Sequence, residues 1–425
     1  MTIPELHQLF LQHPKACTDT RKIEVDCIFF ALKGDNFNGN AYAAEALNKG
    51  AAFAIVDEPK FVTSMNTILV NDVLTTLQEL ATYHRSKSKA TVVALTGSNG
   101  KTTTKELINA VLSKKFRTIA TLGNLNNHIG VPLTLLSIEP DTEMAIVEMG
   151  ANHAKEIAQL CTFAQPDFGY ITNFGKAHLE GFGSVQGVIR AKSELYDHLI
   201  AHKKGIFLNA DDPIQLEKIG SYIEKYGFSK EKETYYPISF IGADPFVHIA
   251  FEDQVAQTQL IGSYNFNNCC AAILIGKYFN VPLNKITEAL EAYVPDNNRS
   301  QIIEKNGRKI ILDAYNANPT SMTLALQNLE QLSDKPKFAI LGDMFELGEQ
   351  SSDEHQGIAE MVERFNFDKA FLIGTHFFDT KTKLDKFKTF EAVENYLKAM
   401  PIPEDGTILI KGSRGMALER LLPLL

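Results

Sequence analysis

Residues 91–104, TVVALTGSNGKTTT, constrain the fold of this chain more than any other stretch. Residues 91–95 are apolar or β-branched, which is typical of a buried strand. Gly97 and Gly100 then bracket a tight turn, and the segment after Lys101 places apolar residues on one face of a helix. This order indicates a phosphate-binding loop, in which backbone N–H groups and a helix N-terminus surround phosphate oxygens.

The G-x-x-G-K-T spacing of this turn is two residues shorter than the common G-x-x-x-x-G-K-[ST] motif. The alternative is a lysine-bearing glycine turn before an ordinary helix. The strand and the helix that flank the turn favour phosphate binding. In that interpretation Lys101 reaches the outer phosphates of a nucleotide, and the Thr102 hydroxyl holds a magnesium ion.

Length and charge limit the classes of protein that this chain can belong to. Its 425 residues exceed a single core, so two to four domains are expected. The net charge of −9 argues against a nucleic-acid partner bound through phosphate contacts. No apolar run has the length of a membrane span, and the N-terminus does not have the pattern of a signal peptide. Five cysteines without C-x-x-C spacing are typical of reduced thiols, so we expect a cytoplasmic protein with no membrane insertion.

The order of predicted strands and helices indicates an α/β protein of three domains. Residues 1–84 form a small α/β domain, and residues 85–89 are interpreted as a short polar linker. Residues 85–296 form the central domain, which contains the phosphate loop in a mostly parallel sheet. Residues 297–425 alternate regularly between strands and helices, as in a Rossmann-like parallel domain, and their last predicted helix spans 416–422.

Polar residues follow several predicted strands. Glu148 follows the strand at 144–147, and Asp313 follows the strand at 309–312. Ligands of doubly wound sheets bind at the carboxyl ends of the strands, so Glu148 is expected to help coordinate magnesium. The alternative for Glu148 is a strand-end carboxylate in a turn. Polar strand ends in all three domains suggest one active site where the domains meet.

Lys192 lies in the middle of the apolar stripe of a helix predicted over 185–200. A buried ammonium is costly unless it is paired or loses its charge. Either Lys192 extends its ammonium to water, or it is functional. Two polar loops of the first domain, 18–21 and 33–40, are likewise either surface turns or the walls of a ligand pocket.

A series of sequence blocks along nearly the whole chain closely resembles the Mur ligase family, the ATP-dependent amide ligases that build the peptidoglycan precursor. Residues 96–103 match the family's short phosphate loop, which accounts for the spacing. The branch that adds D-alanyl-D-alanine to UDP-N-acetylmuramoyl-tripeptide (UDP-MurNAc-tripeptide) is indicated by the last two of the further matching blocks: GNLNNHIGVP at 123–132, EMGA at 148–151, ITNFGKAHLE at 171–180, AKSE at 191–194, NFNN at 265–268, DAYNANP at 313–319 and LGDMFELG at 341–348.

The resemblance implies an ATP-dependent ligase that acts as a monomer and uses two magnesium ions. Thr102 and Glu148 would hold one ion. His178 and Lys192 would hold the other, with Lys192 carboxylated by CO₂ at its side-chain nitrogen. The tripeptide carboxylate would take the γ-phosphate of ATP to form an acyl phosphate, which the amine of D-Ala-D-Ala attacks. The residues implied to be catalytic are Lys101, Asn126, His178 and Lys192.

The resemblance also implies binding residues. Those for ATP are Thr96, Gly97, Ser98, Asn99, Gly100, Lys101, Thr102, Thr103, Asn265, Asn268, Arg299 and Asp313. Those for the two substrates, UDP-MurNAc-tripeptide and D-Ala-D-Ala, are Thr18, Asp19, Thr20, Arg21, Asn38, Asn124, Asn316 and Asn318. The chain departs from the family pattern at five positions, where Thr20 replaces serine, Asn38 aspartate, Asn40 histidine, Tyr264 histidine and His128 an acidic residue.

Two alternatives stay open. The first is another amide ligase of this superfamily, acting on UDP-MurNAc-dipeptide or of the folylpolyglutamate type. The Y-N-A-N-P block argues against the dipeptide enzyme, and the loop at 18–21 argues against the folate enzyme. The second is a non-catalytic ATP-binding scaffold. A scaffold has no need for a second metal site, so His178 and Lys192 argue against it.

Overall fold

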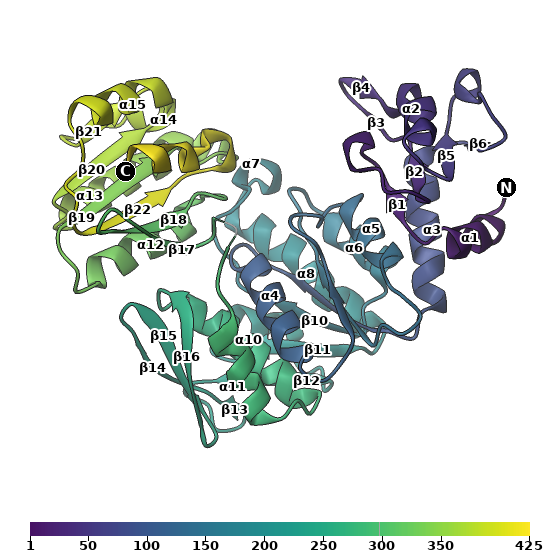
Figure 1. Ribbon diagram of the computed structural model, residues 1–425. Coiled ribbons are helices and arrows are strands. Elements are labelled where there is room, and N and C mark those ends of the chain that lie inside the picture. Colours follow the sequence, from purple (N-terminus) through teal and green to yellow (C-terminus); the bar gives the residue numbers. More distant parts are fainter. Residues whose placement is uncertain (297) are drawn as a thin grey trace.

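The computed structural model describes residues 1–296 and 298–425 and shows three α/β units (Figure 1). The N-terminal unit, in purple, and the C-terminal unit, in yellow and green, lie on either side of the central unit. Asn297, the first residue of the predicted last domain, lies outside the described residues. Within the described ranges, no helix is both long and apolar enough to cross a membrane.

The N-terminal unit is a parallel sheet in the strand order β1-β2-β5-β6, with a separate short hairpin. Helix α1 begins at a capping box formed by Thr2 and Glu5. The strands are β1 (Ala16–Cys17), β2 (Ile28–Phe30), β3 (Lys33–Gly34), β4 (Phe37–Asn38), β5 (Phe53–Val56) and β6 (Thr67–Leu69), and the helices are α1 (Ile3–Gln12), η1 (Thr20–Lys22), η2 (Gly39–Tyr42), α2 (Ala43–Asn48), η3 (Pro59–Phe61) and α3 (Val73–Lys87).

Helix α3 corrects the predicted linker at 85–89, because it continues without a break to Lys87. The predicted domain boundary between residues 84 and 85 falls inside this helix. Arg85 is buried, and its guanidinium donates to the carbonyls of Ala164 and Gln165 and to the Asp167 carboxylate at 2.8 Å. The first two are carbonyls at the C-terminus of a neighbouring helix, where a cation is favourable. A polar sequence that indicated a linker is therefore an anchor to the central unit.

The central unit is a seven-stranded parallel sheet in the order β13-β12-β11-β10-β7-β9-β8, so β7 and its phosphate loop lie near the middle. The strands are β7 (Thr91–Thr96), β8 (Thr118–Ala120), β9 (Met144–Glu148), β10 (Phe168–Ile171), β11 (Gly205–Asn209), β12 (Lys225–Ser229) and β13 (Tyr236–Pro237). The helices are α4 (Lys101–Leu112), α5 (Gly130–Leu136), α6 (Glu156–Ala164), α7 (Leu179–Phe182), α8 (Val185–Ala201), α9 (Pro213–Ile219), α10 (Asn265–Tyr278) and α11 (Leu283–Ala292).

A second, antiparallel sheet in this unit was not predicted from the sequence. It contains β14 (Ser239–Ala243), β15 (Phe246–Phe251) and β16 (Gln254–Ile261). Along β15 the buried side chains are Val247, Ile249 and Phe251, and they join a core cluster with residues of α10 and α11. This period of two is typical of a sheet with one face on the core.

The C-terminal unit is a six-stranded sheet in the order β17-β18-β22-β19-β20-β21, parallel except for the β17–β18 pair. The strands are β17 (Gln301–Lys305), β18 (Arg308–Asp313), β19 (Lys337–Gly342), β20 (Lys369–Ile373), β21 (Asp385–Phe387) and β22 (Thr407–Lys411). The helices are α12 (Pro319–Gln331), η4 (Gly348–Gln350), α13 (Ser351–Arg364), α14 (Thr375–Phe378), α15 (Phe390–Ala399), η5 (Arg414–Met416) and η6 (Leu418–Leu424). The α/β fold class predicted from the sequence is confirmed.

The predicted α-helix over 416–422 is wrong. The segment forms two 3-10 helices, η5 and η6. Ala417 separates them in the left-handed region at φ +46°, and Pro423 lies inside the second. A left-handed residue interrupts the hydrogen-bond ladder of an α-helix, and proline contributes no N–H to it.

Candidate active site

A pocket of about 500 Å³ lies between the central and C-terminal units, where the strands of both sheets end. The loop after β7 forms one wall. Gly97 has φ +144° and Gly100 has φ +77°. A Cβ atom on Gly97 would collide with Thr172 Oγ1, and one on Gly100 would lie 2.6 Å from Asn268 Oδ1. Both positions therefore require glycine, which gives the predicted loop its tight turn.

Lys101 is folded back over this loop. Its ammonium donates to the Gly97 carbonyl at 2.8 Å and to the Ser98 carbonyl at 3.2 Å. Burial lowers the pKa of Lys101, and the nearby Glu148 carboxylate opposes that shift. The charged nitrogen thus lies at the mouth of a loop that presents backbone amides, as phosphate binding requires.

Glu148, at the end of β9, joins two other predicted residues. Its Oε2 accepts a 2.9 Å hydrogen bond from Thr102 Oγ1, and its Oε1 accepts one of 2.8 Å from Asn126 Nδ2. The Glu148 backbone N–H donates to Thr121 Oγ1 at 3.0 Å. A hydroxyl next to a carboxylate suits Mg²⁺, which prefers oxygen ligands and usually completes its shell with phosphates and water. Among the residues that the structure describes, no three His, Cys, Asp or Glu side chains gather as metal ligands.

Asn265 and Asn268, on α10, stand behind the loop. Asn268 Nδ2 donates to Asn265 Oδ1 at 2.7 Å, and Asn265 Nδ2 donates to the Ile261 carbonyl. Asn268 Oδ1 accepts from Thr104 Oγ1 at 3.1 Å. Both asparagines line the pocket, and the hydrogen bond between Asn268 and Thr104 connects α10 to α4.

The side chain of Lys192 is fully buried, which excludes the alternative in which its ammonium extends to water, and its functional role stays a prediction. The ammonium donates one hydrogen bond, to the Ala151 carbonyl at 3.2 Å, and lies 5.2 Å from the centre of the Phe182 ring. Burial, followed by the charge of Lys101, lowers the pKa of Lys192 to about 7. A lysine in this state has a large neutral fraction near pH 7, and a neutral amine is nucleophilic. His178, just before α7, lines the pocket near this lysine's helix.

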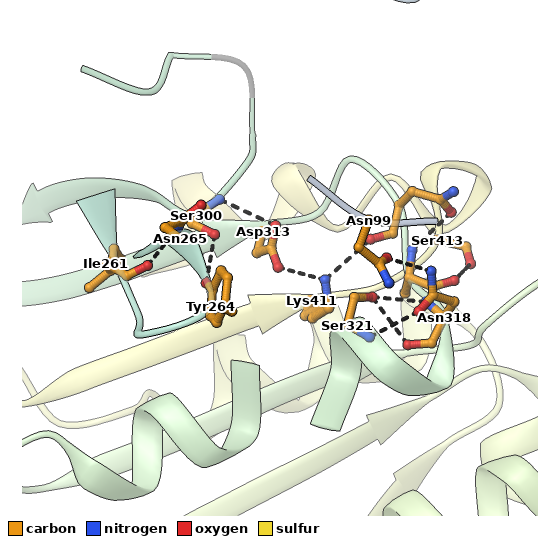
Figure 2. Close-up of polar contacts among 12 residues, drawn as sticks. Asn99, Ile261, Tyr264, Asn265, Ser300, Asp313, Asn318, Ser321, Lys411 and Ser413 are labelled. Atoms are coloured by element: carbon orange, nitrogen blue, oxygen red, sulfur yellow. Dashed lines mark hydrogen bonds and ion pairs between the residues drawn. The ribbon is translucent and has the colours of Figure 1, made fainter. Parts of the chain in front are cut away.

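Figure 2 shows how the C-terminal unit contributes to the pocket. Asp313 ends β18 and lies 2.5 Å from Lys411 Nζ, at the end of the neighbouring strand β22. The Asp313 carboxylate also accepts from the backbone N–H of Ser300, whose hydroxyl lies 2.8 Å from the Tyr264 hydroxyl. Tyr264, which stands where the family usually has histidine, therefore joins the central unit to the C-terminal one.

Asn318 makes a second bridge (Figure 2). Its Oδ1 caps α12 by accepting from Ser321 N at 2.9 Å. Its Nδ2 donates to Asn99 Oδ1, at the tip of the phosphate loop, at 2.7 Å. Both ends of the Asn318 amide thus have partners within the protein, and its role in binding substrate stays a prediction.

The structure gathers most of the predicted site residues in one pocket. Thr96, Gly97 and the fully buried Lys192 do not line the pocket wall. The predicted residues that line the wall are Ser98, Asn99, Gly100, Lys101, Thr102, Thr103, Asn124, Asn126, Glu148, His178, Asn265, Asn268, Arg299, Asp313, Asn316 and Asn318. Lys411, predicted only as a polar strand end, and Tyr315, to which no role was assigned, also line the pocket. The Tyr315 ring stacks 3.7 Å from the Arg299 guanidinium.

The predicted substrate residues of the N-terminal unit are not part of this pocket. Arg21 donates to both carboxylate oxygens of Asp19, which caps the η1 helix that contains Thr20. These hydrogen bonds from Arg21 lower the pKa of Asp19 to about 2. Asn38 caps η2 and donates to Glu58 at 2.7 Å. Thr18, which precedes Asp19, does not line the pocket either. The substrate-binding roles of these loops therefore stay predictions.

A short phosphate loop, an acidic strand end beside it and a C-terminal α/β unit across the same pocket define a three-domain protein of the nucleotide-binding class. Residues 95–276 match the family model of the Mur ligase middle domain, and residues 298–414 match that of the Mur ligase glutamate ligase domain. The chain belongs to the Mur ligase family.

Individual relatives show which members of this family the chain is similar to. The UDP-N-acetylmuramoyl-tripeptide–D-alanyl-D-alanine ligase of Bacillus subtilis is 33% identical, over 95% of this chain and 91% of its own. A crystal structure of MurF from Acinetobacter baumannii matches with a TM-score of 0.85 and 30% identity, covering 99% of this chain and 98% of that one. MurF from Thermotoga maritima in complex with ADP matches with a TM-score of 0.83 and 27% identity, covering 97% of both chains.

Proposed function

We propose that this protein joins D-alanyl-D-alanine to the terminal carboxylate of UDP-MurNAc-tripeptide, using ATP, to complete the pentapeptide precursor of peptidoglycan. The observation that supports it most is the contact of Thr102 and Asn126 with the two oxygens of Glu148, beside the phosphate loop. The names of relatives that align with nearly the whole chain support the particular substrates.

The residues of the central unit would activate the carboxylate. Carboxylates are poor electrophiles, so the tripeptide carboxylate would first take the γ-phosphate of ATP to become an acyl phosphate, releasing ADP. Lys101 and the loop amides would stabilise the negative charge that gathers between phosphate and carboxylate, and Asn126 would lie beside it. Magnesium, held by Thr102 and Glu148, would neutralise charge on the phosphates.

The C-terminal unit would bring the second substrate. The amine of D-Ala-D-Ala would attack the acyl phosphate, and phosphate would leave from the tetrahedral intermediate. Asn316 lines the pocket and follows β18 of the C-terminal unit, so we assign it to the dipeptide side. Contacts such as Asn318 with Asn99 would keep the units together and exclude water, which would otherwise hydrolyse the acyl phosphate.

Lys192 and His178 would form a second magnesium site, with Lys192 carboxylated by CO₂. The support is chemical. Lys192 is fully buried, and among the described residues its ammonium has one hydrogen-bond acceptor, the Ala151 carbonyl. Carboxylation would replace an unpaired cation by an anion that a metal can neutralise.

The test is to follow ADP release with ATP, the tripeptide nucleotide and the dipeptide, and to omit each in turn. We expect turnover only when all three are present, with tripeptides whose third residue is either diaminopimelate or lysine compared side by side. Full ATP turnover without the dipeptide would contradict the ligase. Nucleotide binding without turnover under any condition would favour the scaffold, and turnover with UDP-MurNAc-dipeptide and an amino acid would favour the neighbouring ligase.

A further inference from the structure

The C-terminal unit reaches the rim of the pocket through the turn between β19 and η4, residues 343–348. Glu346 lies in this turn with φ +63°, and His178 of the central unit has φ +52°. A left-handed backbone costs a non-glycine residue about 1–3 kcal/mol and concentrates at functional sites, where the surrounding structure maintains it. Two such residues therefore meet across the boundary between the units.

The contacts between them are specific. Glu346 Oε2 lies 2.5 Å from His178 Nδ1, and the Glu346 carbonyl accepts from Glu180 N–H at 3.2 Å. A Cβ atom on Gly348 would lie 3.4 Å from the Glu180 Cα atom, so the turn packs closely on α7. The carboxylate lies off the direction of the ring N–H, which makes the side-chain contact a close charge contact rather than a linear hydrogen bond.

We propose that Glu346 is a positioning residue for His178. This inference rests on the proposed function, in which His178 binds magnesium. A histidine that ligates a metal usually donates its other ring N–H to a carboxylate, which fixes the tautomer and the ring orientation. The negative charge of Glu346, 2.5 Å from Nδ1, favours the tautomer with the proton on that nitrogen even without a linear hydrogen bond, and this tautomer leaves Nε2 available to the metal.

The arrangement makes docking of the C-terminal unit and metal binding support each other. Glu346 belongs to the C-terminal unit and His178 to the central one, so the histidine is oriented only when the two units are in contact. Energetic coupling between two binding events is reciprocal, so bound metal also favours the docked arrangement. The acyl phosphate would then form mainly when the C-terminal unit, which carries the proposed dipeptide site, is docked on the central unit.

The same boundary offers a matched control. Lys176 Nζ lies 2.6 Å from Glu354 Oε1, and Lys176 N–H donates to Thr320 Oγ1 at 3.0 Å. Glu354 therefore joins the same two units without touching His178. Each of the two variants, Glu354→Gln and Glu346→Gln, removes one negative charge that contacts the central unit. Only Glu346→Gln also removes the carboxylate that contacts His178. Glu346 is exposed, so its substitution leaves the core unchanged.

The experiment measures binding of Mn²⁺, as a substitute for Mg²⁺, to the full chain with ADP and bicarbonate, by electron paramagnetic resonance. We expect Glu346→Gln to weaken Mn²⁺ binding at the site that contains His178 by about tenfold. This is the lower end of the loss in metal affinity when a metal-bound histidine loses its carboxylate partner. Glu354→Gln should stay within about twofold of the wild type, since Glu354 pairs with an exposed lysine and does not contact His178. Nitrogen NMR of His178 should show the Nδ1-protonated tautomer in the wild type and a mixture of tautomers in Glu346→Gln. Glu346→Asp should partly restore the Nδ1-protonated tautomer.

Equal metal affinity in Glu346→Gln and the wild type would overturn the proposal. An equal loss in the Glu354→Gln control would also overturn it, because docking alone would then explain the effect. The measurement needs no dipeptide and no turnover. A failure here leaves three-substrate ADP release intact, whereas a failure of the ligase function shows in that assay and leaves the histidine tautomer as it is.

Discussion

The unpaired, buried ammonium of Lys192 should make the unmodified protein less stable than a variant without it. Burial lowers the pKa of Lys192 to about 7 from an ordinary value of 10.5. The unfolded chain therefore binds more protons than the folded one between these values, and stability rises with pH across that window. At pH 8 the penalty amounts to about 3 kcal/mol, from about 1.4 kcal/mol per pH unit over the remaining interval.

Lys192→Met removes this penalty and fills a similar volume. In CO₂-free buffer at pH 8 we expect α8 in the variant to be more protected from opening by about 3 kcal/mol, with the gap shrinking by about 1.4 kcal/mol for each pH unit toward pH 10. Hydrogen–deuterium exchange of α8 peptides measures this directly. Ligase turnover should be lost in the same variant, because the residue proposed to be carboxylated is gone.

Lys105 supplies the matched control. It is equally buried, but its ammonium donates to the Thr121 carbonyl at 2.5 Å and pairs with Glu106 at 2.7 Å. Lys105→Met should therefore destabilise by about 1–3 kcal/mol, because it leaves these partners unsatisfied. If Lys192→Met were no more stable than the wild type at pH 8 while Lys105→Met behaved as expected, the reasoning about an unpaired ammonium would be refuted.

Three further predictions concern the pocket and its supports. Glu148→Gln should weaken ADP binding about tenfold or more when Mg²⁺ is present and leave metal-free binding nearly unchanged, as measured by titration calorimetry. Gly100→Ala places a Cβ atom 2.6 Å from Asn268 Oδ1 at φ +77°, so the loop should be destabilised by about 1–3 kcal/mol and ADP binding lost, whereas wild-type affinity would contradict the loop geometry. Burial lowers the pKa of both His7 and His84, so the unfolded state binds more protons and the urea midpoint should fall as pH drops below about 6.5; His84→Gln should flatten that dependence.

The corrections to the sequence prediction have different origins. The helix over 416–422 is interrupted by its own Ala417 and Pro423, whereas the segment 85–89 makes contacts with residues far away in the sequence. Arg85 belongs to a helix because carbonyls about 80 residues away accept its guanidinium. The antiparallel strands β14 to β16 alternate clearly in burial, but their pairing connects residues whose proximity only the folded chain determines. Local sequence patterns predict a helix or strand well when the residues of that element are enough to stabilise it.

The sequence by itself determined the phosphate loop, because a strand, two obligatory glycines and Lys101 lie in one continuous stretch and encode their own backbone geometry. It also determined the α/β class and the strand-end position of Glu148. Only the tertiary structure decided that Thr102 and Asn126 meet the two oxygens of that carboxylate, and that Glu346 meets His178. Such contacts depend on how units separated by up to 170 residues pack against each other, since burial and partnership are properties of the assembled chain.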